Sequence, residues 1–139
     1  MLTILDKYSV FDDVIMNTIK EQAMGNKKGL LYYLRSYSEY YENYPQITAV
    51  MFSYDVYRYD GTVNEKMKNI IEKRQEFVTG LIENGQKNGE IRSDISAHDL
   101  ADIILGLVWS HTYKWKTFGC TFSLKEKILN SIGFILGQI

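Results

Sequence analysis

Among the residue types of this chain, tyrosine has the spacing that most clearly suggests a functional site. The sequence has eleven tyrosines, and nine of them lie between Tyr32 and Tyr59. One group recurs at intervals of three and four residues, which places it on one side of a helix, and its members are Tyr33, Tyr37, Tyr40, Tyr41 and Tyr44. An aromatic helix face either packs into a core or lines a cavity. Both interpretations stay open on the spacing alone.

Adaptable side chains elsewhere in the chain favour the cavity. Methionine and phenylalanine fill irregular apolar spaces, and they occur on three other expected helices at Met16, Met51, Phe52, Met67 and Phe77. A lining of this composition suits an apolar or aromatic ligand. The sequence therefore predicts a site for a small molecule of that kind.

Groups that usually carry catalysis are sparse. His98 lies beside Asp99 in the first turn of an expected helix, where a histidine is usually solvated or caps the helix. His111 lies in the middle of the same helix, so it is either a hydrogen-bonded core residue or a polar contact in the cavity. Thirteen positions separate the two histidines, which is roughly 20 Å of helix and too far for a shared metal ion. We expect no catalytic residue, no metal site, no cofactor and no enzymatic activity.

The distribution of charged, cysteine and apolar residues excludes several other classes of protein. The formal charge is −1, and acidic and basic residues alternate along the chain, so we expect no direct binding to nucleic acid. The lone cysteine, Cys120, excludes an intramolecular disulfide and fits a reducing compartment. No apolar run approaches the roughly 18 residues that a membrane helix needs. The expected location is the cytoplasm.

The elements that position these residues are all predicted to be helices. Apolar residues recur at helical spacing and Pro45 is the only proline. A hydroxyl three residues before a carboxylate favours a helix start, and this pattern occurs at Ser9 with Asp12, Thr62 with Glu65, Ser96 with Asp99, and Ser123 with Glu126. We expect one all-α domain over residues 1–139, with six helices at residues 9–23, 29–43, 46–57, 62–88, 97–118 and 124–137. The apolar residues Leu2, Ile4 and Leu5 also allow the first helix to begin earlier.

The last two helices carry more apolar residues than one buried face requires. The helix at 97–118 is apolar on almost every side, so both of its sides should be covered. In the last helix Gly133 and Gly137 lie four residues apart, where missing side chains let another helix approach. This pattern predicts that a second copy of the chain covers the outer side of the two helices. The alternative is that the last helix only closes the monomer.

A resemblance to a known family rests on the region after the longest helix. Residues 81–92 read LIENGQKNGEIR, residues 93–101 read SDISAHDLA, and Gly106, Leu107 and Trp109 follow. This stretch, with the helix before Pro45 and the short one after it, resembles the C-terminal effector-binding and dimerisation domain of TetR-type transcriptional regulators. Such regulators are two-domain repressors whose N-terminal helix-turn-helix binds operator DNA. That half is expected to be missing from this chain.

The resemblance implies a homodimer, in which the last two helices of each copy form a four-helix bundle, and a small-molecule effector. Carried onto this sequence, the dimer interface comprises Gly106, Trp109, Ser110, Tyr113, Ile128, Ile132, Gly133 and Leu136. The effector pocket comprises Val14, Thr18, Tyr33, Tyr37, Met51, Tyr54, Met67, Phe77 and His111. Two other hypotheses remain at this point. One is a small helical enzyme or carrier that uses the tyrosine cavity with His111, and the other is a purely structural dimerisation module.

Overall fold

The computed structural model describes residues 2–48 and 60–137, and these ranges form a single all-α domain without strands. The elements are α1 (Leu2–Glu21), α2 (Asn26–Asn43), the short 3-10 helix η1 (Pro45–Thr48), α4 (Gly61–Lys87), α5 (Ala97–Thr117) and α6 (Leu124–Leu136). The all-α prediction is confirmed, with five α-helices in the described ranges. Of the helix expected at 46–57, only the part in η1 can be compared, because the rest lies outside the described residues.

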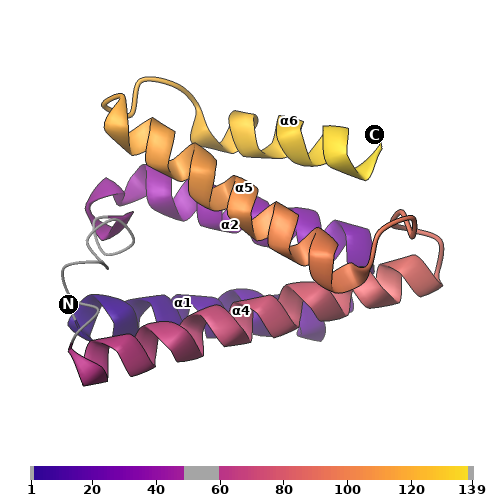
Figure 1. Ribbon diagram of the computed structural model, residues 1–139, viewed down its shortest axis with the longest axis horizontal. Helices are drawn as coiled ribbons and strands as arrows, with labels where there is room; N and C mark the ends of the chain where they lie inside the picture. The colour runs from indigo at the N-terminus through magenta and orange to yellow at the C-terminus, as the bar shows by residue number, and fades with distance from the viewer. Residues whose placement is uncertain (1, 49–59, 138–139) are drawn as a thin grey trace.

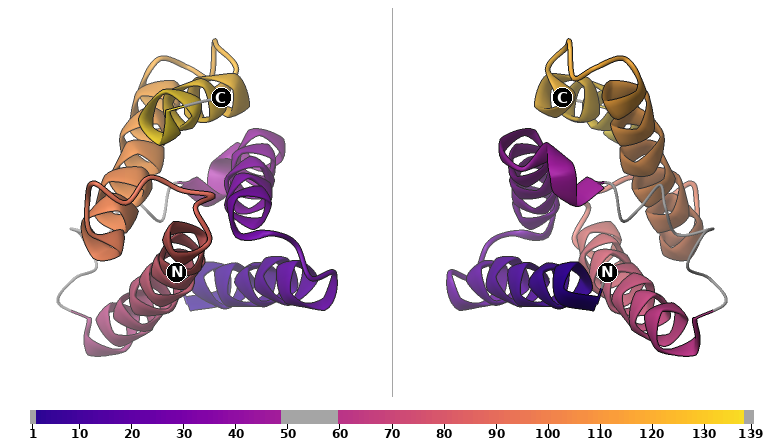
Figure 2. Two further views of the ribbon diagram at one scale, coloured as in Figure 1. Left: turned by 90° about the vertical axis from the view of Figure 1, so that its right-hand side faces the viewer. Right: turned by 90° about the vertical axis from the view of Figure 1, so that its left-hand side faces the viewer.

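Helix α2 lies at the centre of the packing. It contacts α1, α4 and α6, while α5 contacts α4 and α6. Figure 1 shows α1 and α4 side by side along one edge and α6 along the opposite edge, with α2 and α5 between them. The end views of Figure 2 agree, since α1 and α6 lie on opposite sides of the molecule. Helix α5 turns back from the end of α4 and diverges from it along its length (Figure 1).

Two of the four predicted helix starts are confirmed. The Ser96 side chain accepts a hydrogen bond from the Asp99 amide, and the Ser123 side chain accepts one from the Glu126 amide. Helix α1 begins at Leu2 instead of Ser9, so Ser9 lies within the helix. Helix α4 is capped by Asp60, which accepts from the amides of residues 62 and 63, and the prediction that Thr62 forms the cap is wrong.

The connection between α4 and α5 is held by a close approach at Gly85. The Gly85 carbonyl accepts hydrogen bonds from the amides of Glu90 and Ile91. The buried Ile91 side chain lies against Gly85, and a Cβ built there would come within 2.6 Å of its Cδ1 atom. Gly89 supplies the left-handed turn with φ of 76°. Glycine at position 85 therefore lets the chain reverse tightly onto the end of α4.

Replacing Gly85 with alanine is expected to lower the free energy of unfolding by about 1–3 kcal/mol, because the added methyl overpacks the contact with Ile91. Gly80 in the same helix is the matched control, since a Cβ there meets nothing within 4 Å. Gly80→Ala should raise stability by roughly 0.5–1 kcal/mol through helix propensity. Urea denaturation followed by circular dichroism measures both. Equal stabilisation by the two variants would contradict the close approach at Gly85.

None of the described helices is long and apolar enough to cross a membrane.

Candidate functional site

A cavity of about 270 Å³ lies where α2, α4 and α5 face one another. Helix α2 contributes Tyr33, Leu34, Tyr37 and Tyr41, helix α4 contributes Ile71, Arg74 and Gln75, and helix α5 contributes Leu105, Gly106, Val108 and Trp109. Most of these side chains are apolar or aromatic. A concave site of this kind, with a few convergent polar groups, is the usual form of a small-molecule pocket.

The tyrosine wall of the cavity follows from helical spacing. Tyr33, Tyr37 and Tyr41 are one turn apart on α2, so their rings lie along the same face. The ring centroids of Tyr33 and Tyr37 are 4.6 Å apart, and those of Tyr37 and Tyr41 are 6.1 Å apart. All three residues are buried, and they also line the cavity. The tyrosine face thus serves as core and as cavity wall, and both sequence interpretations apply to it.

A buried ion pair adjoins this wall, and its Arg74 side chain also lines the cavity. Arg74 on α4 binds Asp12 on α1 through two hydrogen bonds, with Nε to Oδ2 at 2.9 Å and Nη2 to Oδ1 at 3.0 Å. The Asp12 side chain is 2% exposed and that of Arg74 is 16% exposed. The Tyr37 hydroxyl donates to the same carboxylate, and the guanidinium lies 4.7 Å from the centroid of the Tyr37 ring. These contacts join α1, α2 and α4 at one point.

The tyrosine hydroxyls of the wall are neutral over the physiological range. Burial raises the pKa of Tyr33, Tyr37 and Tyr41 above the ordinary value for a phenol, and the nearby guanidinium of Arg74 offsets only part of this. The hydroxyls therefore keep their protons. They can donate hydrogen bonds but add no negative charge to the cavity.

The predicted pocket residues are only partly brought together. Tyr33 and Tyr37 line the cavity, and Phe77 stacks on Tyr33 with ring centroids 5.9 Å apart. Met67 is buried in the core but does not line the cavity. Met51 and Tyr54 lie outside the described residues.

Two predicted pocket residues on α1 lie away from the cavity. Val14 is exposed on the surface, and the Thr18 hydroxyl donates to the Val14 carbonyl oxygen one turn earlier. The face of α1 that turns inward is the one that carries Asp12, which is fixed by its pairing with Arg74. Val14 lines a separate groove, with Phe11 of α1 and Tyr40 of α2.

His111 is a hydrogen-bonded residue between α5 and α6 and does not line the cavity. Its Nε2 atom lies 2.9 Å from Ser131 Oγ, and its Nδ1 atom is buried without a hydrogen-bond partner in the described ranges. Burial lowers the His111 pKa, and Lys127 and Lys114 lower it further, so the ring is neutral at pH 7. A serine–histidine pair needs a group that orients the second ring nitrogen to act in catalysis. The described residues supply none here.

Sequence reasoning missed Arg74 and Gln75. The sequence signal for Arg74 is its place in the helix, because it falls on the apolar stripe of α4 formed by Met67, Ile70 and Val78. The alternation of charges around Arg74 is more typical of a solvated helix face, and this hid its inward position. The missed α5 residues, Leu105 and Val108, gave no separate signal, since apolar residues occur on almost every side of that helix.

The predicted dimer-interface residues divide into two groups. On α5, Gly106, Trp109, Ser110 and Tyr113 are exposed. On α6, Gly133 is partly exposed, but Ile128, Ile132 and Leu136 are buried within the chain. The exposed apolar residue of α6 is Phe134, which the sequence prediction omitted and which is 89% exposed. Four large apolar side chains of α5 and α6 are therefore exposed, Ile103, Trp109, Tyr113 and Phe134, and Trp109 also lines the cavity.

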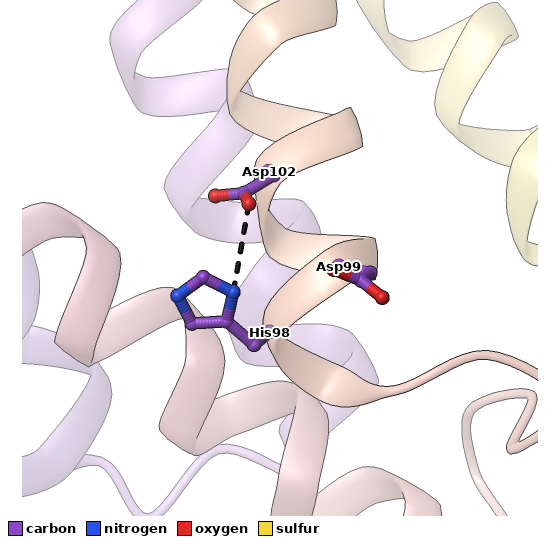
Figure 3. Close-up of side chains that lie close together, drawn as sticks. All are labelled: His98, Asp99 and Asp102. Atoms are coloured by element: carbon purple, nitrogen blue, oxygen red, sulfur yellow. Dashed lines mark ion pairs between the residues drawn. The ribbon is translucent and has the colours of Figure 1, made fainter.

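One further group of polar side chains lies at the start of α5. His98 Nδ1 is 3.5 Å from Asp102 Oδ2 one turn later, and Asp99 lies near them, with one possible metal-ligand atom of each of the three residues within 4.8 Å of the others (Figure 3). All three side chains are exposed. Exposed pairs one turn apart contribute little binding or stability because water competes for each group. His98 is the solvated residue that its sequence position predicts.

Comparison of the chain with protein-family models, curated proteins and solved structures found no match.

Proposed function

We propose that this chain is the effector-binding and dimerisation domain of a TetR-type transcriptional regulator. The observation that carries the proposal is the tyrosine-lined cavity between α2, α4 and α5. It lies among the helices that precede α6, where the resemblance at residues 81–109 implies an effector pocket. The layout of five α-helices and the short η1 is consistent with this assignment.

The cavity favours a small apolar or aromatic effector. Ligand pockets commonly measure roughly 300–1,000 Å³, and this cavity of about 270 Å³ lies just below that range. Its walls hold three tyrosine rings and one tryptophan. A compound of one or two rings fits this volume, and stacking on the aromatic walls would hold it.

The outer face of α5 and α6 supports the second part of the proposal. Ile103, Trp109 and Tyr113 are exposed on α5, and Phe134 is exposed on α6. Clustered exposed apolar side chains are typical of interfaces. The proposed partner is a second copy of the chain, with α5 and α6 of each copy forming a four-helix bundle.

Regulation would then depend on a DNA-binding half joined to this domain. A ligand shifts a conformational equilibrium only by its differential affinity for two states. The effector would favour one spacing of two helix-turn-helix units in a cytoplasmic dimer. This chain would bind effector and its second copy, while operator binding would need the N-terminal half.

Thermal denaturation with a panel of one- and two-ring aromatic compounds, including indole, quinoline and naphthalene, tests the cavity. A compound present at 100 times its Kd should stabilise the chain by about 2.7 kcal/mol. Ile71→Trp, at a partly exposed wall position, should fill the cavity and remove the shift. Ile103→Trp is the matched control, because Ile103 is also exposed but does not line the cavity. A panel without any stabilising compound at millimolar concentration would contradict the proposed function.

A further inference from the structure

The lining of the tyrosine cavity also selects among aromatic ligands. On the basis of the proposed function, we propose that the ligand is a neutral, planar aromatic molecule that carries a hydrogen-bond acceptor contacted by Gln75. Charge, shape and one unpaired amide group support this assignment.

Charge is the first criterion. Among the described residues, Arg74 is the only charged one in the lining, and Asp12 already binds its guanidinium through two hydrogen bonds. An anionic ligand would compete with Asp12 for Arg74 and leave a buried carboxylate without its partner. A cationic ligand would meet Arg74 and no carboxylate from the described part of the lining. A neutral ligand avoids both penalties.

Shape is the second criterion. Tyr33, Tyr37 and Tyr41 on α2 lie opposite Gly106 and Trp109 on α5, so the cavity has aromatic groups on two of its helices. Aromatic rings bind other rings by offset stacking or edge contacts, and both arrangements favour a flat molecule. Position 106 is an exposed glycine that also lines the cavity, and a Cβ there would meet nothing within 4 Å.

Hydrogen bonding is the third criterion. Gln75 lines the cavity, and its Nε2 atom is buried without a hydrogen-bond partner among the described residues. Such an unpaired donor is unfavourable, and an acceptor on a bound molecule would satisfy it. The Tyr37 hydroxyl is less available than Gln75 as a donor to the ligand, because it already donates to Asp12. A carbonyl oxygen or a ring nitrogen on the ligand is the matching group.

Three matched probes test the assignment by titration calorimetry. Naphthalene has no acceptor, 2-acetylnaphthalene has a neutral acceptor, and 2-naphthoate carries a negative charge. We expect 2-acetylnaphthalene to bind about fivefold more tightly than naphthalene, the effect of one neutral hydrogen bond. We expect 2-naphthoate to bind more weakly than 2-acetylnaphthalene.

Gln75→Leu keeps the side-chain volume and removes the donor. In this variant the advantage of 2-acetylnaphthalene should disappear, and an unchanged affinity for naphthalene would show that the cavity is intact. Thr79→Val is the matched control, because the Thr79 hydroxyl is also buried and unpaired on α4 but does not line the cavity. This control should keep the fivefold preference.

The outcomes separate this inference from the proposed function. Binding of naphthalene without any preference for 2-acetylnaphthalene would overturn the role of Gln75 and leave the cavity as a binding site. A preference that survives in Gln75→Leu, or tighter binding of 2-naphthoate, would overturn it as well. Failure of all three probes to bind would overturn the proposed function, and this inference with it.

Discussion

Replacing Arg74 with methionine is expected to lower the free energy of unfolding by about 3–5 kcal/mol. Methionine keeps much of the side-chain length but leaves the Asp12 carboxylate, which is 2% exposed, without its cation. The Tyr37 hydroxyl would remain as its donor, and one neutral donor does not balance a buried charge. Urea denaturation followed by far-ultraviolet circular dichroism measures the change.

Lys73→Met is the control for this variant. Lys73 precedes Arg74 and pairs with Asp13, but both side chains of that pair are more than half exposed. Its loss should change stability by less than about 0.5 kcal/mol. The double variant Asp12→Asn with Arg74→Met removes both charges and should recover much of the loss. Equal stabilities for Arg74→Met and Lys73→Met would show that the Asp12–Arg74 pair is not buried.

Replacing Ile132 with alanine is expected to lower the free energy of unfolding by about 2–5 kcal/mol, because the substitution leaves a cavity in the core. Ile132 is 0% exposed within a single chain, and helix α6 packs on α2 and α5. The effect should be independent of protein concentration if the side chain belongs to the monomer core. Chemical denaturation at several protein concentrations measures both the size of the loss and its concentration dependence.

Phe134→Ala is the matched control on the same helix. Phe134 is 89% exposed, so its removal should change the stability of the monomer by less than about 0.5 kcal/mol. Under the proposed dimer, however, it should weaken self-association in sedimentation experiments. A large loss of monomer stability in Phe134→Ala, with little loss in Ile132→Ala, would reverse the assignment of the two faces of α6.

Local sequence rules predicted the helices well because the signals are local. Ser96 and Ser123 cap the helices that follow them, and the ends of α4, α5 and α6 differ from their predicted positions by one residue. The prediction at Ser9 is wrong for a tertiary reason. The carboxylate of Asp12 matched a capping pattern, but it pairs with Arg74, which is 62 residues later in the chain.

The candidate site could be predicted from the sequence only where the spacing of residues within a single helix places them on the same face. Tyr33 and Tyr37 follow from spacing within α2 and line the cavity. The inward face of α1 carries Asp12 together with the buried Leu5, Tyr8, Ile15 and Ile19, and no pattern within α1 reveals that Asp12 pairs with Arg74. Similarly, the number of apolar residues in α6 predicted that some of them would be exposed, but not which ones. Ile132 and Phe134 differ by two positions, and packing on α2 and α5 decides which one is buried.

At residues 74 and 75, helix α4 faces both the cavity and helix α1. Gln75 lines the cavity with residues of α2 and α5, while the adjacent Arg74 holds Asp12 of α1. A displacement of α4 toward or away from the cavity must therefore carry α1 with it or separate the buried ions. Separation is strongly unfavourable. A change of cavity width that moves α4 would therefore be expected to move α1 with it.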